Sequence, residues 1–348
     1  MLILHQIRII SKLLFSGKMI DFVKVQIINT TDIWIQNLER NSLLEFKTVV
    51  STRSGELSDK KEAEYKGMKF IIYESGFILL QGSLHKYWNV GKHNYNSFTY
   101  YDLVEVIEDL RIKFDLSLNN CVLNNLEVGV NIRPPVPTNQ ILNNLMFHRN
   151  IKFKDKDVRM FKGNYKQVRH GRYYIKAYNK KLQYENDFIL LDDILRFELK
   201  YVRMEDLKKF NIRTLIDLVD KTKLAYLKSN LIKVWAEILF FDKSIKRKNL
   251  KKNQREIKIR EWANPNYWGG LNKQRRNEQK KIYNSIVEYH SLQIQKQVYN
   301  LISEEFDFLL NPLPINHNFF SVLTLPFNSS IIGLNSNSIL PVINEIYF

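Results

Sequence analysis

The segment Arg172–Lys181, RYYIKAYNKK, decides the fold of this chain and carries its most reactive side chains. If it is a β-strand, alternation puts two phenols and two ammonium groups on one face: Tyr174, Lys176, Tyr178 and Lys180. The other face is mostly apolar and can pack on a core. A phenol beside cations can attack a phosphodiester, because the cations offset the charge that builds on the phosphate oxygens. The alternative is a plain structural strand, in which tyrosine is common and lysine is solvated.

The composition indicates a folded protein with a polyanionic partner. The 348 residues are 45% apolar and 13% aromatic, enough for one large domain or two of ordinary size. The net charge of +17 favours nucleic acid first and an anionic membrane second. The single cysteine, Cys121, excludes an internal disulfide and a cysteine-built zinc site and suits a reducing compartment. No run of about eighteen apolar residues is present, so no transmembrane helix is expected.

The positive charge is concentrated between Lys243 and Lys281, where fourteen Lys and Arg residues stand against three Glu. Basic groups can hold phosphates while aromatic rings stack on unpaired bases. For Trp262 and Trp268 we expect a packing role instead, because Trp–Gly-rich turns are often packing elements. The basic run could also be a solvated helix, but the overall charge favours contact with DNA. The predicted nucleic-acid contacts are Lys176, Arg196, Lys246, Arg247, Lys248, Lys251, Lys252, Arg275 and Arg276.

The ends of the chain differ in composition from its middle. Residues 1–18 mix apolar and basic residues but lack a clear cleavage site, and Met19 opens MIDFVKVQI, which alternates like a first strand. We therefore expect the fold to begin at Met19, after an N-terminal extension. Residues 311–348 have little charge and are rich in Asn and Ser, which predicts a loosely packed or disordered tail.

The hydrophobic pattern predicts an α+β fold built on one mostly antiparallel sheet with helices on one face. Strands are expected up to about residue 90 and again at 126–132, 172–181 and 194–202. Helices are expected at 99–114, with Thr99 as N-cap and Asp102 in the first turn, at 138–149 and through much of 204–240. The segment 151–171 is predicted to be a loop or short hairpin, and 245–310 is predicted to be basic and helical.

Three further segments show one apolar and one polar face when they are interpreted as strands: 77–88, 126–132 and 194–200. If these strands are neighbours, one sheet face collects His85, Glu127, Glu198, Tyr178 and Lys180, with Gly129 leaving room above the sheet. A histidine with carboxylates suits a Mg²⁺ or Mn²⁺ ion that polarises a phosphate oxygen. The predicted metal ligands are therefore His85, Glu127 and Glu198. Alternatively, His85 is a hydrogen-bonded surface residue, Glu198 pairs with Arg196 or Lys200, and Glu127 is solvated.

From Met19 to about residue 310 the chain resembles the rolling-circle replication initiators of filamentous phages and related plasmids. The matching pieces, in order, are MIDFVKVQI, GSLHKYWN, NNLEVGVNI, YIKAYNKKLQY, ILRFELKYVRMEDLKKFNI with TLIDLV, and YWGGLNKQRRN. In that family the tyrosine of the AY-x-K strand is the nucleophile, which implies Tyr178 here, with Lys180 as the lysine two residues on. The paired metal-binding histidines of better-known relatives are missing, since the segment LHK holds His85 alone.

The resemblance implies a nicking domain over residues 19–224 and a smaller helical replication domain over 225–310, beginning near Ala225. It also implies a cytoplasmic DNA nickase and strand transferase, acting in a bacterial host on a replication origin. Host helicase and polymerase are its expected partners, and no membrane or small-molecule cofactor is expected. Tyr174 remains a second candidate nucleophile. A non-enzymatic origin-binding or repressor protein is the rival, and an anionic-membrane or RNA-binding protein explains the charge but not the strand patterns.

Overall fold

The computed structural model describes residues 17–50, 53, 55–155, 164–184 and 193–312, all within one compact unit that ends at Pro312. The predicted N-terminal extension, apart from Gly17 and Lys18, and nearly all of the predicted low-charge tail lie outside the described residues. Within the described part of the chain, no helix is long and apolar enough to cross a membrane.

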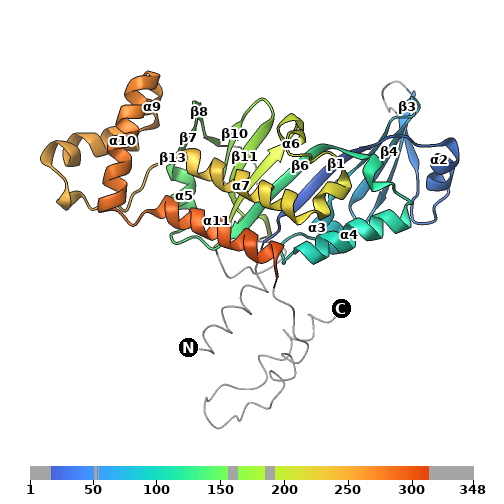
Figure 1. Cartoon of the computed structure of the whole chain (residues 1–348). Coiled ribbons are helices and arrows are strands. Elements are labelled where there is room, and N and C mark those ends of the chain that lie inside the picture. Colours follow the sequence, from blue (N-terminus) through green and yellow to red (C-terminus); the bar gives the residue numbers. More distant parts are fainter. Residues whose placement is uncertain (1–16, 51–52, 54, 156–163, 185–192, 313–348) are drawn as a thin grey trace, which may run out of the picture. The chain divides into compact units, whose positions relative to one another are not determined.

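A ten-stranded sheet forms the centre of the fold, and every strand in it pairs antiparallel with its neighbours (Figure 1). Its order is β2-β3-β4-β5-β1-β6-β12-β11-β10-β9. The strands are β1 (Ile20–Ile27), β2 (Lys47–Val50), β3 (Leu57–Tyr65), β4 (Met68–Tyr73), β5 (Ile78–Ser83), β6 (Cys121–Ile132), β9 (Lys154–Asp155), β10 (Tyr165–Arg169), β11 (Tyr173–Asn179) and β12 (Leu195–Tyr201). The predicted antiparallel α+β class is therefore confirmed.

Four helices cover one face of this sheet (Figure 1): α3 (Leu84–Trp88), α4 (Tyr100–Lys113), α7 (Lys221–Glu237) and α11 (Ile294–Leu310). The N-cap and the apolar stripe of α4 agree with prediction. The Thr99 backbone N–H donates to Asp102 Oδ2 over 2.7 Å, and the buried residues fall on one side of the helix. In α7 and α11 the same periodicity buries residues such as Trp235 and Phe306 against the sheet and each other.

The predicted helix at 138–149 is correct only in its first half. Helix α5 (Thr138–Asn144) ends where β7 (Leu145–His148) begins, and β7 pairs with β13 (Ile238–Phe240) and β8 (Ile151–Lys152) in a second, three-stranded sheet. Leu145 and Met146 continue the helical spacing of the preceding apolar residues. Both are nevertheless buried in the strand, so pairing with β13 overrides the local pattern.

The basic region after β13 is helical, as predicted, and has its own aromatic cluster. The elements are α8 (Ile259–Ala263), α9 (Pro265–Gly270) and α10 (Lys273–His290). Trp262, Trp268 and Tyr283 are the buried centre of this cluster, which also contains Phe147 of β7. The predicted packing role of the two tryptophans agrees with their burial. The predicted domain boundary near Ala225 falls inside α7, which packs in the main core, so packing is continuous across that position.

Two histidines join the end of β7 to the turn between β10 and β11. His148 Nδ1 lies 2.8 Å from His170 Nε2, and His148 Nε2 lies 3.1 Å from Glu237 Oε2 at the end of α7. Arg149 Nε donates to the same Glu237 oxygen over 3.0 Å. Burial lowers the pKa of both histidines, and their proximity lowers the pKa of His148 further. These four residues, here called the histidine pair and its partners, connect three elements of the fold.

Candidate functional site

The polar residues predicted on strands meet where β6, β12 and β11 lie side by side. Lys176 on β11 stands opposite Glu198 on β12, which in turn stands opposite Gly129 on β6. Two residue pairs further along, and therefore on the same face, Tyr178 stands opposite Arg196. Because directly opposed residues of antiparallel strands share a face, these side chains gather on one surface of the sheet.

Tyr178 points at a carboxylate on the neighbouring strand. Its hydroxyl donates a hydrogen bond to Glu198 Oε2 over 3.3 Å, and its ring stacks on Tyr165 with centroids 5.1 Å apart and planes 5° apart. Only 7% of Tyr178 is exposed, with Leu182 packed against the two rings. Burial, followed by the charge of Glu198, raises the pKa of the phenol well above its ordinary value. Loss of its proton therefore needs an acceptor, and Glu198 is in contact with it.

Glu198 is held ionised by two cations. Its Oε1 accepts from Lys176 Nζ over 2.8 Å, and its Oε2 accepts from Arg196 Nε over 3.0 Å. Burial alone would raise the pKa of Glu198, but the charges of Lys176 and Arg196 outweigh burial and hold this pKa below its ordinary value. Glu127 extends the network, because its Oε1 contacts Lys176 Nζ at 3.1 Å and Lys200 Nζ at 2.8 Å.

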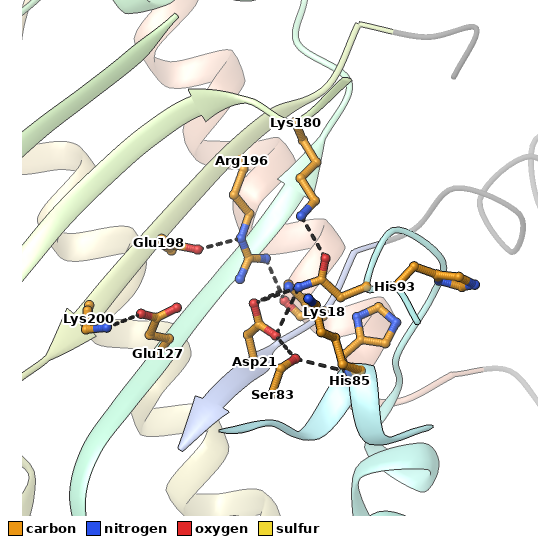
Figure 2. A network of polar contacts seen from close by, with 12 residues as sticks. Lys18, Asp21, Ser83, His85, His93, Glu127, Lys180, Arg196, Glu198 and Lys200 are labelled. Atoms are coloured by element: carbon orange, nitrogen blue, oxygen red, sulfur yellow. Dashed lines mark hydrogen bonds and ion pairs between the residues drawn. The ribbon is translucent and has the colours of Figure 1, made fainter. Parts of the chain in front are cut away.

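A second buried ion pair lies at the start of β1 (Figure 2). Lys18 Nζ contacts Asp21 Oδ2, and the Asp21 carboxylate also accepts from Ser83 Oγ and from Asn94 Nδ2. Between Ile20 and Val23 the register of β1 against β6 shifts by one residue, so a β-bulge carries Asp21. Burial alone would raise the pKa of Asp21, but Lys18, Arg196 and Lys180 outweigh it and hold the pKa far below its usual range.

Lys180 and Arg196 connect the two ion pairs (Figure 2). Lys180 Nζ donates to Asn94 Oδ1 over 3.0 Å, and Arg196 Nη1 donates to the Lys18 carbonyl over 3.1 Å. Burial lowers the pKa of Lys18 to about 8, although Asp21 opposes this shift. Burial and the nearby Lys18 charge lower the pKa of Lys180 well below its ordinary value. Three basic side chains are thus enclosed within one network, here called the lysine–arginine network: Lys18, Lys180 and Arg196.

This arrangement corrects the predicted exposure of the site. Arg196 is a predicted nucleic-acid contact and Glu198 a predicted metal ligand, and both roles require an open surface, yet Arg196 is fully buried and Glu198 is 2% exposed. Gly129 was expected to leave room above the sheet. A Cβ atom there would lie 2.4 Å from the Phe197 carbonyl oxygen and 2.7 Å from the Glu198 Cα atom, so the backbone of β12 already occupies that space. Charged residues are buried on this face because they pair with one another.

His85 was expected on a strand, but it lies in α3. Ser83 ends β5 and caps the helix, with its hydroxyl accepting from the Lys86 backbone N–H over 3.1 Å. The fully buried imidazole stacks on Phe98, and its Nε2 lies 2.7 Å from Asn96 Oδ1. Burial and the Lys18 charge lower the pKa of His85 well below its ordinary value. His85 therefore contacts neither of the other two predicted ligands.

The predicted metal ligands do not form a ready site. Glu127 is engaged by Lys176 and Lys200, Glu198 is engaged by Lys176 and Arg196, and His85 is engaged elsewhere. Over the ranges that the structure describes, no three His, Cys, Asp or Glu side chains are placed to hold a metal ion. The Mg²⁺ or Mn²⁺ ion stays a prediction.

The predicted DNA contacts divide into exposed and internal residues. Six are exposed on the basic region: Lys246, Arg247, Lys248, Lys251, Lys252 and Arg275. Three instead make contacts within the protein. Lys176 and Arg196 pair with Glu198, and Arg276 donates to the carbonyls of Trp268 and Leu271 over 3.0 Å each.

The sequence did not identify Lys18, Asp21 or Asn94 as site residues. The predicted N-terminal extension includes Lys18, but this residue is fully buried, and the fold already includes Gly17, whose N–H donates to Glu305 in α11. Asp21 carried one usable signal, because a carboxylate inside an otherwise apolar strand needs a cation. Asn94 lies between helices and strands, in a stretch without periodicity, so no sequence pattern indicated its place in the site.

Comparison with known proteins adds little to this geometry. No family model and no curated protein matches the chain. Among solved structures, a rolling circle replication initiator protein from Geobacillus stearothermophilus is similar, with 14% identity and a TM-score of 0.36, covering 68% of this chain and 89% of that one. At this TM-score the likeness assigns neither a family nor a function to the chain.

Proposed function

We propose that this protein nicks and rejoins DNA to initiate rolling-circle replication of a phage or plasmid, with Tyr178 as the nucleophile. The observation that carries the proposal is the Tyr178 hydroxyl, hydrogen-bonded to an ionised Glu198 beside the lysine–arginine network. The order of sequence pieces shared with rolling-circle initiators supports the same assignment. Tyr174 is less suited, because its ring lies under Arg169 at 5.5 Å and because Tyr174 stands opposite Lys200, two residue pairs beyond Glu198.

In the proposed reaction, Tyr178 Oη attacks the scissile phosphorus in line. A bond forms between Oη and phosphorus while the bond to the 3′ oxygen breaks, which leaves a 5′-phosphotyrosyl link and a 3′-hydroxyl. The phenol gives its proton to Glu198, the carboxylate it already contacts, and Glu198 or a water molecule passes a proton to the departing 3′ oxygen. A later attack by a 3′-hydroxyl on the adduct reverses these changes and closes the displaced strand.

The basic residues have an electrostatic part in this scheme. A phosphate that approaches Lys18, Lys180 and Arg196 raises the pKa of the two amines, because a nearby negative charge favours their protonated forms. The charged amines then stabilise the extra negative charge of the pentavalent transition state. Tyr178 is only 7% exposed and the three basic residues are buried, so DNA must displace the side chains that cover them, among them Tyr165 and Leu182, before it reaches the hydroxyl.

The partners in this proposal follow from the products. A free 3′-hydroxyl on one strand is a primer for a host polymerase, and a host helicase would separate the strand that carries the adduct. These events place the protein in the bacterial cytoplasm. A Mg²⁺ or Mn²⁺ ion remains a proposed requirement, without assigned ligands.

One observation favours a second candidate, a non-enzymatic origin-binding protein. Tyr178 is nearly enclosed, and the carboxylates beside it are engaged by cations, as in a purely structural network. Such a protein would bind DNA with a steep dependence on salt and would form no covalent product.

The deciding experiment incubates the protein with Mn²⁺ and supercoiled DNA that carries the intergenic region of its own replicon. A denaturing protein gel then reveals any DNA-linked band. We expect an adduct that is lost in Tyr178→Phe and kept in Tyr174→Phe. Loss only in Tyr174→Phe would move the chemistry four residues upstream. Tight, salt-sensitive binding without nick or adduct would support the non-enzymatic protein.

A further inference from the structure

Helix α10 packs on the aromatic cluster through Tyr283. Tyr283 packs edge-on against Trp268 with centroids 6.0 Å apart and against Trp262 at 5.5 Å, and all three rings are buried. The Tyr283 hydroxyl donates to the Phe240 carbonyl over 2.8 Å and accepts from the Asp242 backbone N–H over 2.7 Å. The inner side of α10 is therefore tied to β13 and to the chain that follows it.

A short turn connects α9 to α10, and one arginine fixes it. Asn272 caps α10 by accepting from the Arg275 backbone N–H over 2.9 Å. Arg276 donates to the Trp268 and Leu271 carbonyls on one side and to Asn150 Oδ1, over 2.8 Å, on the other. The angle between α9 and the first turns of α10 is thus held by hydrogen bonds from a single guanidinium group.

The outer side of α10 carries polar side chains that make no tertiary hydrogen bond or ion pair with the other residues that the structure describes. The exposed polar residues of its first three turns are Lys273, Gln274, Arg275, Asn277, Glu278 and Lys281. The one contact among them is local, from Gln274 Nε2 to Glu278 Oε1 over 3.1 Å. Packing does not explain this face, because the residues that hold the helix, including Arg276 and Tyr283, lie on its inner side.

We infer that this outer face of α10 reads base pairs in the major groove of duplex DNA. Arginine pairs with two acceptors of guanine and asparagine with the donor and acceptor of adenine, and these residue types stand at positions 275 and 277, on the two flanks of the exposed face. A short helix, a tight turn and a second helix whose N-terminal residues meet the bases form a docking geometry used by many DNA-binding proteins. The inference deepens the proposed function, since a nickase has to find its origin.

Two features favour duplex DNA over other partners. The basic region from Lys243 to Lys281 carries fourteen cations against three carboxylates, which complements a polyphosphate better than a protein surface. The major groove of B-form DNA admits an α-helix, whereas that of duplex RNA is too narrow for side chains to reach the bases. Exposed Lys246, Lys248 and Lys251, which precede α10 in the chain, are suited to contact the phosphates.

The test selects binding sites from a pool of random 20-base-pair DNA duplexes, using the full chain with Tyr178→Phe so that no cleavage occurs. We expect a preferred motif. Adding Arg275→Ala and Asn277→Ala should reduce discrimination at one or two base pairs by about tenfold each, because a good bidentate contact is worth about 1–3 kcal/mol. Binding to unselected duplex should change much less.

Two control variants distinguish base-specific contacts from contacts with phosphates and from a structural role. Lys248→Ala should weaken binding to every duplex alike and lower the salt slope by about one. Arg276→Ala, the neighbour that fixes the turn, should lower the thermal midpoint, whereas Arg275→Ala should not. The inference is overturned if no motif is enriched, if the double variant keeps the motif at full discrimination, or if duplex RNA of the selected sequence binds equally well. None of these results depends on whether Tyr178 is a nucleophile.

Discussion

The Tyr178 hydroxyl and the Glu198 carboxylate form a 3.3 Å hydrogen bond between adjacent strands, and Glu198 accepts from Arg196 with the same oxygen. Glu198 Oε2 therefore has two partners. It accepts the hydrogen bond from the Tyr178 hydroxyl, and it pairs with the buried Arg196 guanidinium. Glu198 in this way links the proposed chemistry to the stability of the sheet.

Glu198→Gln should therefore affect both activity and stability. We expect single-turnover adduct formation to slow by about 100-fold, since a positioned base contributes 10²–10⁴-fold. The free energy of unfolding should fall by about 3 kcal/mol, because Arg196 loses its partner inside the protein. Glu127→Gln, which leaves the contact with Tyr178 intact, is the control and should slow the reaction less than tenfold. Equal effects of the two variants would argue against Glu198 as the proton acceptor.

Gly129→Ala should destabilise the junction of β6 and β12. The added Cβ meets backbone atoms of Phe197 and Glu198 at 2.4–2.7 Å, and neither can move without separating the strands. We expect a loss of about 3 kcal/mol in urea unfolding, as in other overpacked cores. Gly171→Ala is a matched control, because nothing lies within 4 Å of its Cβ position. A stable Gly129→Ala protein would show that the two strands are further apart in solution.

The buried Lys18 predicts a rise in stability with pH. Its pKa in the folded protein is about 8 against an ordinary 10.5, so between these values the unfolded chain binds more protons. The difference in unfolding free energy between wild type and Lys18→Met should grow by about 2 kcal/mol from pH 8 to pH 10. Lys273→Met, which removes an exposed lysine, is the control and shows how much the difference in unfolding free energy changes with pH without a buried amine. If the difference in unfolding free energy between wild type and Lys18→Met does not change with pH, the Lys18 amine is hydrated in the folded protein.

The histidine pair predicts a loss of stability in acid. His148 and His170 have folded-state pKa values below the ordinary 6.5, so the unfolded chain binds more protons as pH falls, and stability declines below about pH 6.5. Once both rings are protonated, two N–H groups face each other across the 2.8 Å contact, and Arg149 adds to the repulsion that Glu237 offsets. Urea unfolding at pH 7 and pH 5 should show that the free energy of unfolding falls less in His148→Gln than in wild type. His290→Gln should match wild type.

The position of His85 predicts how the reaction responds to Mn²⁺. Because the imidazole is engaged by Asn96 and Phe98, His85→Gln should leave the half-saturating Mn²⁺ concentration of adduct formation within about twofold of wild type. The measurement is a titration of Mn²⁺ after EDTA treatment of both proteins. A tenfold higher requirement in the variant would return His85 to the predicted ligand set.

Hydrophobic periodicity predicted those strands and helices whose apolar residues alternate or form a stripe along one segment of the chain. The strands around Glu127, Tyr178 and Glu198 alternate, and the stripe of α4 starts at a capped Thr99, so these elements could be read directly. The segment Leu145–His148 could not, because its helical spacing is overridden by pairing with β13, which is more than ninety residues away.

The details of the candidate site depend on contacts that alternation does not encode. The bulge that carries Asp21 exists only in the pairing of β1 with β6. The burial of Arg196 and Glu198 depends on cations and carboxylates from separate strands. Ser83 ends its strand by capping α3, which moved His85 off the sheet. The sequence thus predicted the strands that carry Glu127, Tyr178 and Glu198, but not the buried ion pair of Lys18 and Asp21.

The place of β12 in the sheet has a consequence for how the protein is made. This strand, Leu195–Tyr201, is inserted between β6 and β11, both of which precede it in the chain. Its pairing with β6 closes a loop of more than sixty residues, so this step is slow compared with the formation of hairpins. The carboxylate beside Tyr178 therefore arrives last, after the strand bearing the tyrosine has left the ribosome. A nascent or truncated chain that ends before β12 therefore carries Tyr178 without Glu198, and the proposed DNA nicking would begin only when this strand is in place.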